Sequence, residues 1–211
     1  NAEAITLSGQ VSIRWIEHEM NKYLNKILKT EKQDYVIASD TDSIYLNLGP
    51  LVDAVYKGRE KTDQSVVGFL NTVCEDKLEP FISRSYEALA TYVNAYEQKM
   101  IMKRENIAST GIWTAKKRYM LNVWDSEGVR YHEPKLKMMG IEAVKSSTPM
   151  PCRNAIKDAI KIMMDGTEND LVSFIDSFRK TFDNLPPEDI AFPRSVNGLR
   201  KYKASTTVYT K

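Results

Sequence analysis

The stretch Tyr35-Val-Ile-Ala-Ser-Asp40-Thr41-Asp42-Ser43-Ile-Tyr-Leu-Asn-Leu48 holds two carboxylates, one residue apart, between two short apolar runs. The apolar and β-branched residues on both sides predict two strands, and Asp, Thr and Ser are common turn residues, so we expect a β-hairpin with Asp40 to Ser43 at its tip. Carboxylate oxygens on a rigid backbone are the ligands that a hard divalent cation prefers. Taken alone, these four residues are explained more simply as a polar turn.

A metal site at this tip requires that the two carboxylates point the same way and that a further ligand comes from elsewhere. Residues two apart on a strand point to the same side, so Asp40 and Asp42 are expected to share a face, although the tip bends this arrangement. A pair of metals needs another carboxylate from elsewhere in the chain. Glu105, on a strand predicted from Met100 to Ile107, is the candidate third ligand. Its alternative reading is a solvated strand glutamate.

The composition is that of a globular protein, because 42% of the 211 residues are hydrophobic and 27% are charged. The length suits one large or two small domains. A net charge of +2 does not exclude nucleic acid, since the position of the charges matters more than their sum. Cys74 and Cys152 have no metal or redox spacing and are read as free thiols in a reducing compartment. No apolar run is long enough for a membrane helix, so no membrane association is expected.

The apolar spacing predicts an α+β fold. An amphipathic helix is expected over residues 5–28, and a connection with one short helix over 47–64. Helical patterns follow from Val66 and from Pro80. Strands are predicted at 99–102, at 113–124 and from Val129, as an antiparallel meander. Ser146-Ser-Thr-Pro149 predicts a helix start with a hydroxyl cap, and Gly166-Thr167 a second start. The second helix, ended by Pro186-Pro187, is expected to bury its apolar face, which comprises Leu171, Phe174, Ile175, Phe178 and Phe182.

Two basic stretches are candidates for nucleic-acid contact. In Trp113-Thr-Ala-Lys116-Lys117-Arg118-Tyr119, a strand puts Lys117 and Tyr119 on one face and Lys116 and Arg118 on the other. Lysine and arginine on rigid strands suit phosphate contact, whereas the simpler reading is a solvated basic face. The second stretch, Phe192 to Lys203, could track a phosphate backbone or be only a polar connection.

These motifs together resemble the B-family DNA polymerases. Asp40-Thr41-Asp42-Ser43 between apolar strands resembles motif C of that family, and Trp113 to Asn122 resembles its Lys-Lys-Arg-Tyr motif. Glu133-Pro-Lys-Leu-Lys-Met-Met-Gly-Ile-Glu142 followed by Ser146-Ser-Thr-Pro149 is similar to the passage from palm to thumb. Asn1-Ala-Glu-Ala-Ile-Thr6 resembles the stretch after motif B. Within the family, the whole chain is similar to the replicative polymerases of T-even-like bacteriophages.

The resemblance implies a palm segment over residues 1–145 and the start of a thumb over 146–211. Asp42 would be the direct ligand of both catalytic Mg²⁺ ions, and Asp40 a supporting carboxylate. Thr41 and Asp42 would lie at the incoming nucleotide, and Thr41 also at the DNA. The other DNA-binding residues implied are Lys116, Lys117, Arg118, Tyr119, Arg200 and Lys201.

The implied partners are primer-template DNA, deoxynucleoside triphosphates and an upstream polymerase segment, with a sliding clamp reached through a C-terminus beyond this chain. The implied location is the cytoplasm of an infected bacterial host. The chain departs from the family at two places: Ala38-Ser39 stands where Tyr-Gly is usual, and Lys103 stands where related phage enzymes carry an acid.

Parts of the family's machinery are not found in the chain, which also lacks an initiator methionine and is expected to belong to something longer. The missing parts are the Asp…Ser-Leu-Tyr-Pro motif with the other catalytic Asp, the Lys…Asn-Ser-Tyr-Gly motif and the exonuclease domain. The chain alone is therefore expected not to extend a primer. The alternatives are a non-catalytic DNA-binding subunit of a split polymerase, a purely structural subunit and a stand-alone metal-dependent nuclease, which would need a further acidic cluster.

Overall fold

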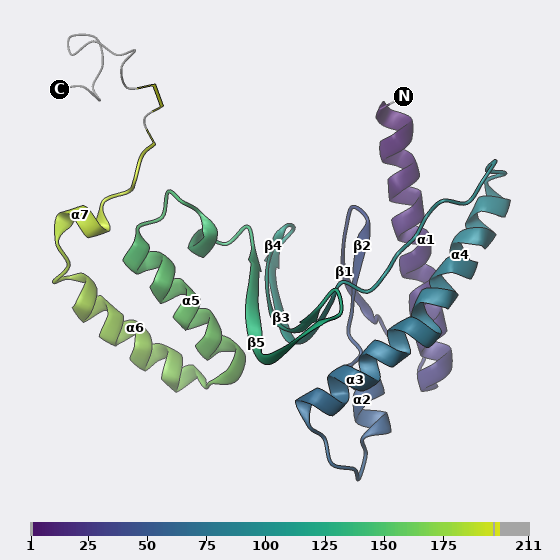
Figure 1. Ribbon diagram of the computed structural model, residues 1–211, viewed down its shortest axis with the longest axis horizontal. Helices are drawn as coiled ribbons and strands as arrows, with labels where there is room; N and C mark the ends of the chain where they lie inside the picture. The colour runs from purple at the N-terminus through teal and green to yellow at the C-terminus, as the bar shows by residue number, and fades with distance from the viewer. Residues whose placement is uncertain (1, 196, 199–211) are drawn as a thin grey trace. The chain divides into compact units, whose positions relative to one another are not determined.

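The computed structural model describes residues 2–195, 197 and 198, and it confirms the predicted α+β class (Figure 1). The chain divides into two compact units. The first comprises Asn1–Ser109 with Leu121–Lys135, and the second comprises Thr110–Met120 with Leu136–Lys211. The helices are α1 (Ala2–Leu28), α2 (Gly49–Val55), α3 (Asp63–Val73), α4 (Glu79–Tyr92), α5 (Met150–Asp165), α6 (Glu168–Phe182) and α7 (Pro187–Ile190), with a π-helical turn η1 (Cys74–Leu78) and a 3₁₀ turn η2 (Glu142–Val144).

The strands form two antiparallel sheets. The strands β1 (Val36–Asp40) and β2 (Ser43–Leu46) make the predicted hairpin, and β3 (Asn106–Ala115), β4 (Arg118–Ser126) and β5 (Val129–Met139) pair in that order as the predicted meander. No helix in the described part of the chain combines the length and the apolar composition that a membrane crossing requires.

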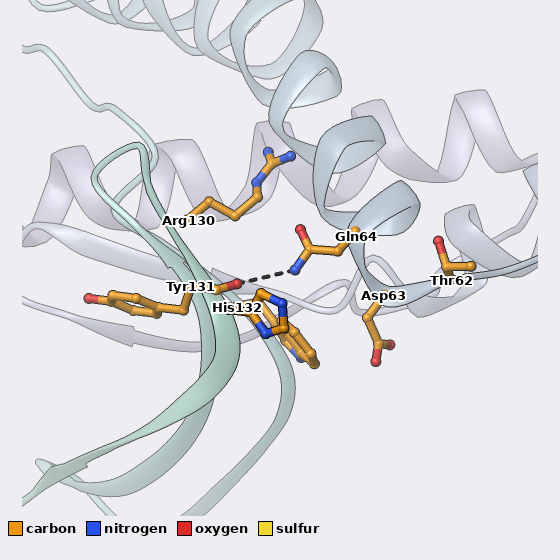
Figure 2. Close-up of a pocket in the computed structure, with 7 residues that line it drawn as sticks. Thr62, Asp63, Gln64, Arg130, Tyr131 and His132 are labelled. Carbon is orange, nitrogen blue, oxygen red and sulfur yellow. Dashed lines mark hydrogen bonds between the residues drawn. The ribbon is translucent and has the colours of Figure 1, made fainter.

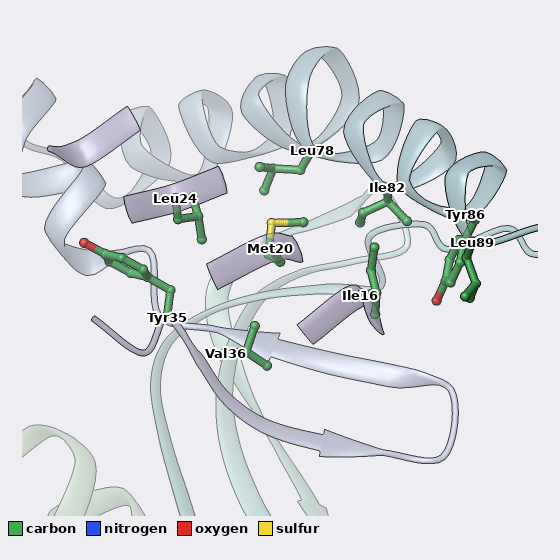
Figure 3. Packing of buried hydrophobic residues seen from close by; sticks show 9 residues of the cluster. All are labelled: Ile16, Met20, Leu24, Tyr35, Val36, Leu78, Ile82, Tyr86 and Leu89. Atoms are coloured by element: carbon green, nitrogen blue, oxygen red, sulfur yellow. The ribbon is translucent and has the colours of Figure 1, made fainter. Parts of the chain in front are cut away.

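The core of the first unit lies between α1, α4 and the β1–β2 hairpin (Figure 3). Ile16, Met20 and Leu24 recur every fourth residue on α1, so they form one stripe that is completely buried. This stripe meets the following buried residues of the hairpin and of η1 and α4: Tyr35, Val36, Leu78, Ile82, Tyr86 and Leu89. The hairpin is thus fixed at its base by a packed core.

The helical patterns predicted from Val66 and from Pro80 are joined without a break. The π-helical turn η1 connects α3 directly to α4, and Pro80 occupies the first turn of α4, as predicted. Pro80 follows the wider π-helical turn η1. Because proline has no N–H, this position leaves no backbone donor without a partner.

Two strand predictions were wrong in detail. Residues 99–102 are not a strand, and β3 begins only at Asn106. In the segment before β3, side chains take the backbone groups that a sheet would need, because Gln98 Nε2 donates to Met100 O at 2.9 Å and Glu79 accepts from Arg104 N at 3.0 Å. Lys116 and Lys117 do not lie within a strand either, because they form the turn between β3 and β4.

In the second unit, the two helices after residue 146 form, but their details differ from the prediction. Helix α5 starts at Met150 without a side-chain cap, so the expected hydroxyl cap is wrong, whereas Thr167 caps α6 with Asp170 as its reciprocal partner. Helix α6 ends at Phe182, before Pro186-Pro187. The expected apolar face of α6 is only partly buried, because Leu171, Phe174, Phe178 and Phe182 are partly exposed and Ile175 is exposed.

Candidate metal and nucleic-acid site

The two carboxylates lie at the tip of the β1–β2 hairpin. Asp40 ends β1, opposite Ser43, and Thr41 and Asp42 form the connecting turn. The N–H of Asp42 donates to the carbonyl of Asp40 at 2.7 Å, and Thr41 has a φ of 57°. This is a γ-turn with positive φ, a rare and strained form, and a β-branched residue is an outlier there. The hydrogen bond holds the backbones of Asp40 and Asp42 together at the tip.

A β-bulge changes the face on which Asp40 lies. Val36 pairs with Leu46, but Ala38 pairs with Tyr45, so Ile37 is an extra residue in β1. Residues opposite each other in an antiparallel pair share a face, so beyond the bulge Asp40 shares a face with Ala38 and Tyr45 and not with buried Val36. By this register Asp40 lies on the face opposite to that of Val36, and its side chain is partly exposed.

Local hydrogen bonds support the carboxylates. Thr41 Oγ1 donates to Asp40 Oδ1 at 3.0 Å, and Ser43 Oγ donates to the Asp40 carbonyl at 3.1 Å. Asp40 is partly exposed, whereas Thr41 and Asp42 are exposed. Asp42 is thus accessible to a ligand from solvent, while Asp40 is held by its neighbours.

Asn21 on α1 fixes the base of the hairpin, a role that the sequence did not reveal. Its Oδ1 accepts from the backbone N–H of Tyr35 at 2.7 Å and of Val36 at 2.9 Å. One turn later, Asn25 holds residue 33, because Asn25 Oδ1 accepts from Gln33 N at 3.0 Å and Asn25 Nδ2 donates to Gln33 O at 2.8 Å. An Asn pair at i and i+4 before a strand is the only signal that could have suggested this.

We expect Asn21→Ala to lower the free energy of unfolding by about 1–3 kcal/mol, because two backbone donors at the edge of the core lose their acceptor. Asn21→Asp retains an acceptor oxygen and should keep most of the stability. Urea unfolding followed by circular dichroism measures both variants. Equal stability of Asn21→Ala and the unmodified chain would show that Asn21 does not fix the hairpin.

Glu105 lies on an irregular segment directly before β3, and its side chain is exposed. The backbone there is held by a buried ionic network in which Arg104 Nη1 donates to Asp125 Oδ1 and Arg104 Nη2 to Asn71 Oδ1. The N–H of Glu127 also donates to the Glu105 carbonyl at 2.6 Å. The network therefore fixes the main chain of Glu105, whose exposed carboxylate accepts from Asn106 Nδ2 at 3.4 Å.

A complete metal-binding group is not assembled within the described residues, because they contain no cluster of three or more His, Cys, Asp or Glu side chains that could hold an ion. Asp40 and Asp42 lie close in sequence at one tip, but Glu105 does not join them in such a cluster. The prediction that Glu105 is the third ligand gains no support from this arrangement. Asp40 and Asp42 are hard oxygen donors and suit a share of a Mg²⁺ site.

The basic motif forms the tip of the second hairpin. Lys116 and Lys117 are exposed at the turn, and Lys117 has a φ of 59°. Arg118, the first residue of β4, donates from Nη2 to both carboxylate oxygens of Glu142, at 2.9 and 2.7 Å. Tyr119 is only 6% exposed, and its ring lies 6.3 Å from that of Trp113. The two lysines are thus the most accessible members of the motif.

Glu142 stays ionised near the basic tip. Hydrogen bonds from Lys145, from its own backbone N–H and from Arg118 lower the pKa of Glu142 from 4.5 to about 2. Because the folded-state pKa is lowered, the stabilisation from this carboxylate is complete above about pH 4.5 and is lost as the pH falls through about 2. The Arg118–Glu142 pair is therefore intact at neutral pH.

A shallow hollow lies where the start of α3 meets β5 (Figure 2). Gln64 Nε2 donates across it to the Tyr131 carbonyl at 3.1 Å, and Arg130 and His132 also line it. A capping box closes the start of α3, because the Thr62 hydroxyl accepts from the N–H of Ser65 and the Ser65 hydroxyl accepts from the N–H of Thr62. We therefore interpret the hollow as a packing contact between α3 and β5 and not as a binding site. The predicted DNA-binding residues Arg200 and Lys201 lie outside the described residues.

Two curated proteins align with almost the whole chain. The DNA-directed DNA polymerase of Escherichia phage RB69 is 40% identical over 210 residues, which is 96% of this chain and 23% of that protein. The DNA-directed DNA polymerase of Enterobacteria phage T4 is 38% identical over 210 residues, with the same coverage. The chain thus spans about a quarter of the length of these relatives. No protein-family model matches it. The predicted resemblance to phage replicative polymerases is confirmed.

Proposed function

We propose that this chain is the part of a B-family replicative DNA polymerase that carries one catalytic carboxylate hairpin and a primer-binding turn. One observation carries the proposal: two carboxylates occupy the strained tip of a hairpin, in a chain 40% identical over 96% of its length to a DNA-directed DNA polymerase. The reaction is templated transfer of a nucleotide to the 3′-hydroxyl of a primer, with release of pyrophosphate. Residues 1–145 are assigned to the palm and 146–211 to the thumb.

Asp42 is the proposed direct ligand of two Mg²⁺ ions, and Asp40 supports it. The exposure of Asp42 and the hydrogen bonds that hold Asp40 support this division of roles. When bound, Mg²⁺ stabilises both the attacking and the leaving oxygens of the transfer. Because the described residues hold only part of a ligand set, the remaining carboxylate is assigned to an upstream polymerase segment. That segment is also proposed to contact the deoxynucleoside triphosphate, together with Thr41 and Asp42 of this chain.

Lys116 and Lys117 are the proposed contacts to the primer strand. Their exposure at the tip of a rigid hairpin supports this role, since two cations there can reach phosphates or minor-groove acceptors. Arg118 is paired with Glu142, and Tyr119 is buried, so both are proposed to act mainly by shaping the turn. A sliding clamp is proposed to bind elsewhere on the polymerase.

The proposal is tested first with the chain alone. We expect it to bind primer-template DNA in fluorescence anisotropy, with an affinity that falls as salt rises and does not need Mg²⁺. We also expect no templated incorporation until an upstream polymerase polypeptide is added. If that polypeptide restores no synthesis while DNA binding persists, the chain is instead a non-catalytic DNA-binding subunit, a role that the exposed lysine turn favours.

Lys117→Gly is expected to weaken DNA binding without loss of stability. Glycine accepts the φ of 59° with less strain than lysine, so the free energy of unfolding should stay equal or rise by up to about 1 kcal/mol. Loss of one phosphate contact should lower the slope of log affinity against log salt by about 1. Anisotropy titrations at several salt concentrations and thermal unfolding measure the two effects. Unchanged binding would remove Lys117 from the interface.

A further inference from the structure

Gly140 lies directly against the lysine turn. It follows β5 with a φ of +66°, a conformation that L side chains rarely adopt. A Cβ added there would lie well inside 3.0 Å of the Lys117 carbonyl oxygen, and 3.1 Å from Arg118 Cγ. Because the nearest atom belongs to the main chain, no side-chain rotation relieves the clash. Both the φ value and the close approach therefore require glycine at this position.

Glu142, two residues later, contacts the residue that directly follows the same turn. Arg118 Nη2 donates to both of its carboxylate oxygens, and Lys145 Nζ donates to Oε1 at 3.1 Å. Arg118 is the residue after the turn, so this contact fixes the point where β4 begins. Gly140 and Glu142 thus contact consecutive residues of the basic motif.

The segment that carries both residues is anchored in the core of the second unit. Ile141 and Ala143 are buried, and they cluster with Met120 of β4 and Ile160 of α5. The segment that contacts the turn is therefore itself packed against helix α5. Lys117, in contrast, has a φ of 59°, a left-handed backbone conformation that is uncommon for a residue with a side chain.

We propose that residues 140–142 form a seat that positions the Lys116–Lys117 turn for contact with DNA, with Gly140 and Glu142 as positioning residues. The proposal rests on the proposed function, because DNA is the ligand that the turn would meet. The seat explains how Lys117 keeps a left-handed backbone conformation: the main chain of Gly140 lies against Lys117, and the carboxylate of Glu142 binds Arg118. The cost of the strained lysine is then offset by contacts with the core of the second unit.

Gly140→Ala tests the steric half of the seat, and Gly58→Ala is its matched control. Gly58 has a similar φ of +75°, but an added Cβ meets nothing within 4 Å. Both variants impose backbone strain, and only Gly140→Ala displaces the turn. We expect Gly140→Ala to weaken primer-template binding by about fivefold or more, and Gly58→Ala by less than about twofold, at equal folded fraction. Equal affinities of the two variants would overturn the seat.

Glu142→Ala tests the ionic half, and here two readings predict opposite signs. If Glu142 acts only as a negative charge near a polyanion, its removal tightens DNA binding. If it positions Arg118 and the turn, its removal weakens binding despite the gain in positive charge. We expect weaker binding, with Glu142→Gln intermediate. Glu188→Ala, which removes an acid from α7, should leave binding equal or slightly tighter. Tighter binding by Glu142→Ala would contradict the proposal.

A structural readout separates failure of the seat from failure of the proposed function. Backbone amide NMR resonances of residues 116–118 should shift in Gly140→Ala and remain in place in Gly58→Ala. If the unmodified chain does not bind primer-template DNA, the proposed function is overturned, and with it the DNA role of the seat. If the unmodified chain binds DNA and the resonances of the turn do not move in Gly140→Ala, only the seat is overturned.

Discussion

Asp42→Asn is expected to lower templated incorporation on the order of 10³-fold, because Asp42 is the proposed ligand of both metals and its loss would remove several kcal/mol of transition-state stabilisation. The assay uses a hybrid enzyme in which this chain replaces the matching 210 residues of the phage RB69 polymerase. Asparagine has nearly the same shape as aspartate, and the backbone N–H of residue 42 that closes the γ-turn is retained. The fold of the tip should therefore persist.

The control for this experiment is Asp53→Asn, which neutralises an exposed carboxylate of the same unit that is paired with Lys61. Its incorporation rate should stay within about twofold of the unmodified hybrid. Primer-template affinity should be nearly unchanged in both variants, because neither residue is a DNA-binding cation. An Asp42→Asn hybrid with full activity would remove Asp42 from the metal site.

The largest effect on stability is expected from Asp125→Asn. Asp125 is 2% exposed, and its carboxylate accepts from Arg104 and from the backbone N–H of Gly128 at 3.0 Å, with Arg130 Nε at 3.7 Å. The Arg104 side chain is only 10% exposed, so its charge would remain buried without a full counter-charge. Breaking a buried ion pair on one side costs about 3–5 kcal/mol.

The matched control is Asp158→Asn, the same substitution at an exposed ion pair with Lys161 on α5. Exposed pairs contribute about 0–1 kcal/mol, so this variant should unfold at nearly the same urea concentration as the unmodified chain. The comparison separates the effect of burial from the effect of charge removal. Similar small losses for both variants would mean that the Arg104–Asp125 network does not stabilise the first unit.

The Arg104–Asp125 network also connects the segment before β3 to the sheet. Arg104 directly precedes Glu105, and Asp125 accepts from both Arg104 and the turn between β4 and β5. It thus ties the segment before β3 to the sheet. This network was not predicted, because Arg104, Asn71 and Asp125 are far apart along the chain and have no shared pattern. Residues that meet through tertiary packing are not predictable from local spacing.

The carboxylate hairpin was predicted correctly because its information is local. Two apolar runs flank a cluster of turn residues, and the buried Tyr35 and Val36 confirm the expected packing. The bulge at Ile37 was missed, since the extra residue is visible only from the pairing with β2. It matters because it decides the face on which Asp40 lies.

The lysine turn was missed for the opposite reason. Lys116 and Lys117 are not typical turn residues, and the stretch from Trp113 to Trp124 reads as one strand. In the structure, Gly140 and Glu142 contact the turn from more than twenty positions later in the chain. The strand predicted at 99–102 failed because the Gln98 side chain bonds the Met100 carbonyl, and Glu79 accepts from the N–H of Arg104 just beyond this stretch. The lysine turn thus depends on contacts from residues far along the chain, which local propensity does not report.

The central claim is that this chain supplies one carboxylate hairpin of a polymerase active site. Single-turnover incorporation by the RB69 hybrid, with primer, template, one deoxynucleoside triphosphate and Mg²⁺, tests it most directly. The account predicts that the hybrid extends the primer by the templated nucleotide and that this activity disappears with Asp42→Asn. A folded hybrid that binds the primer-template but adds no nucleotide, with Asp42 intact, would contradict the claim.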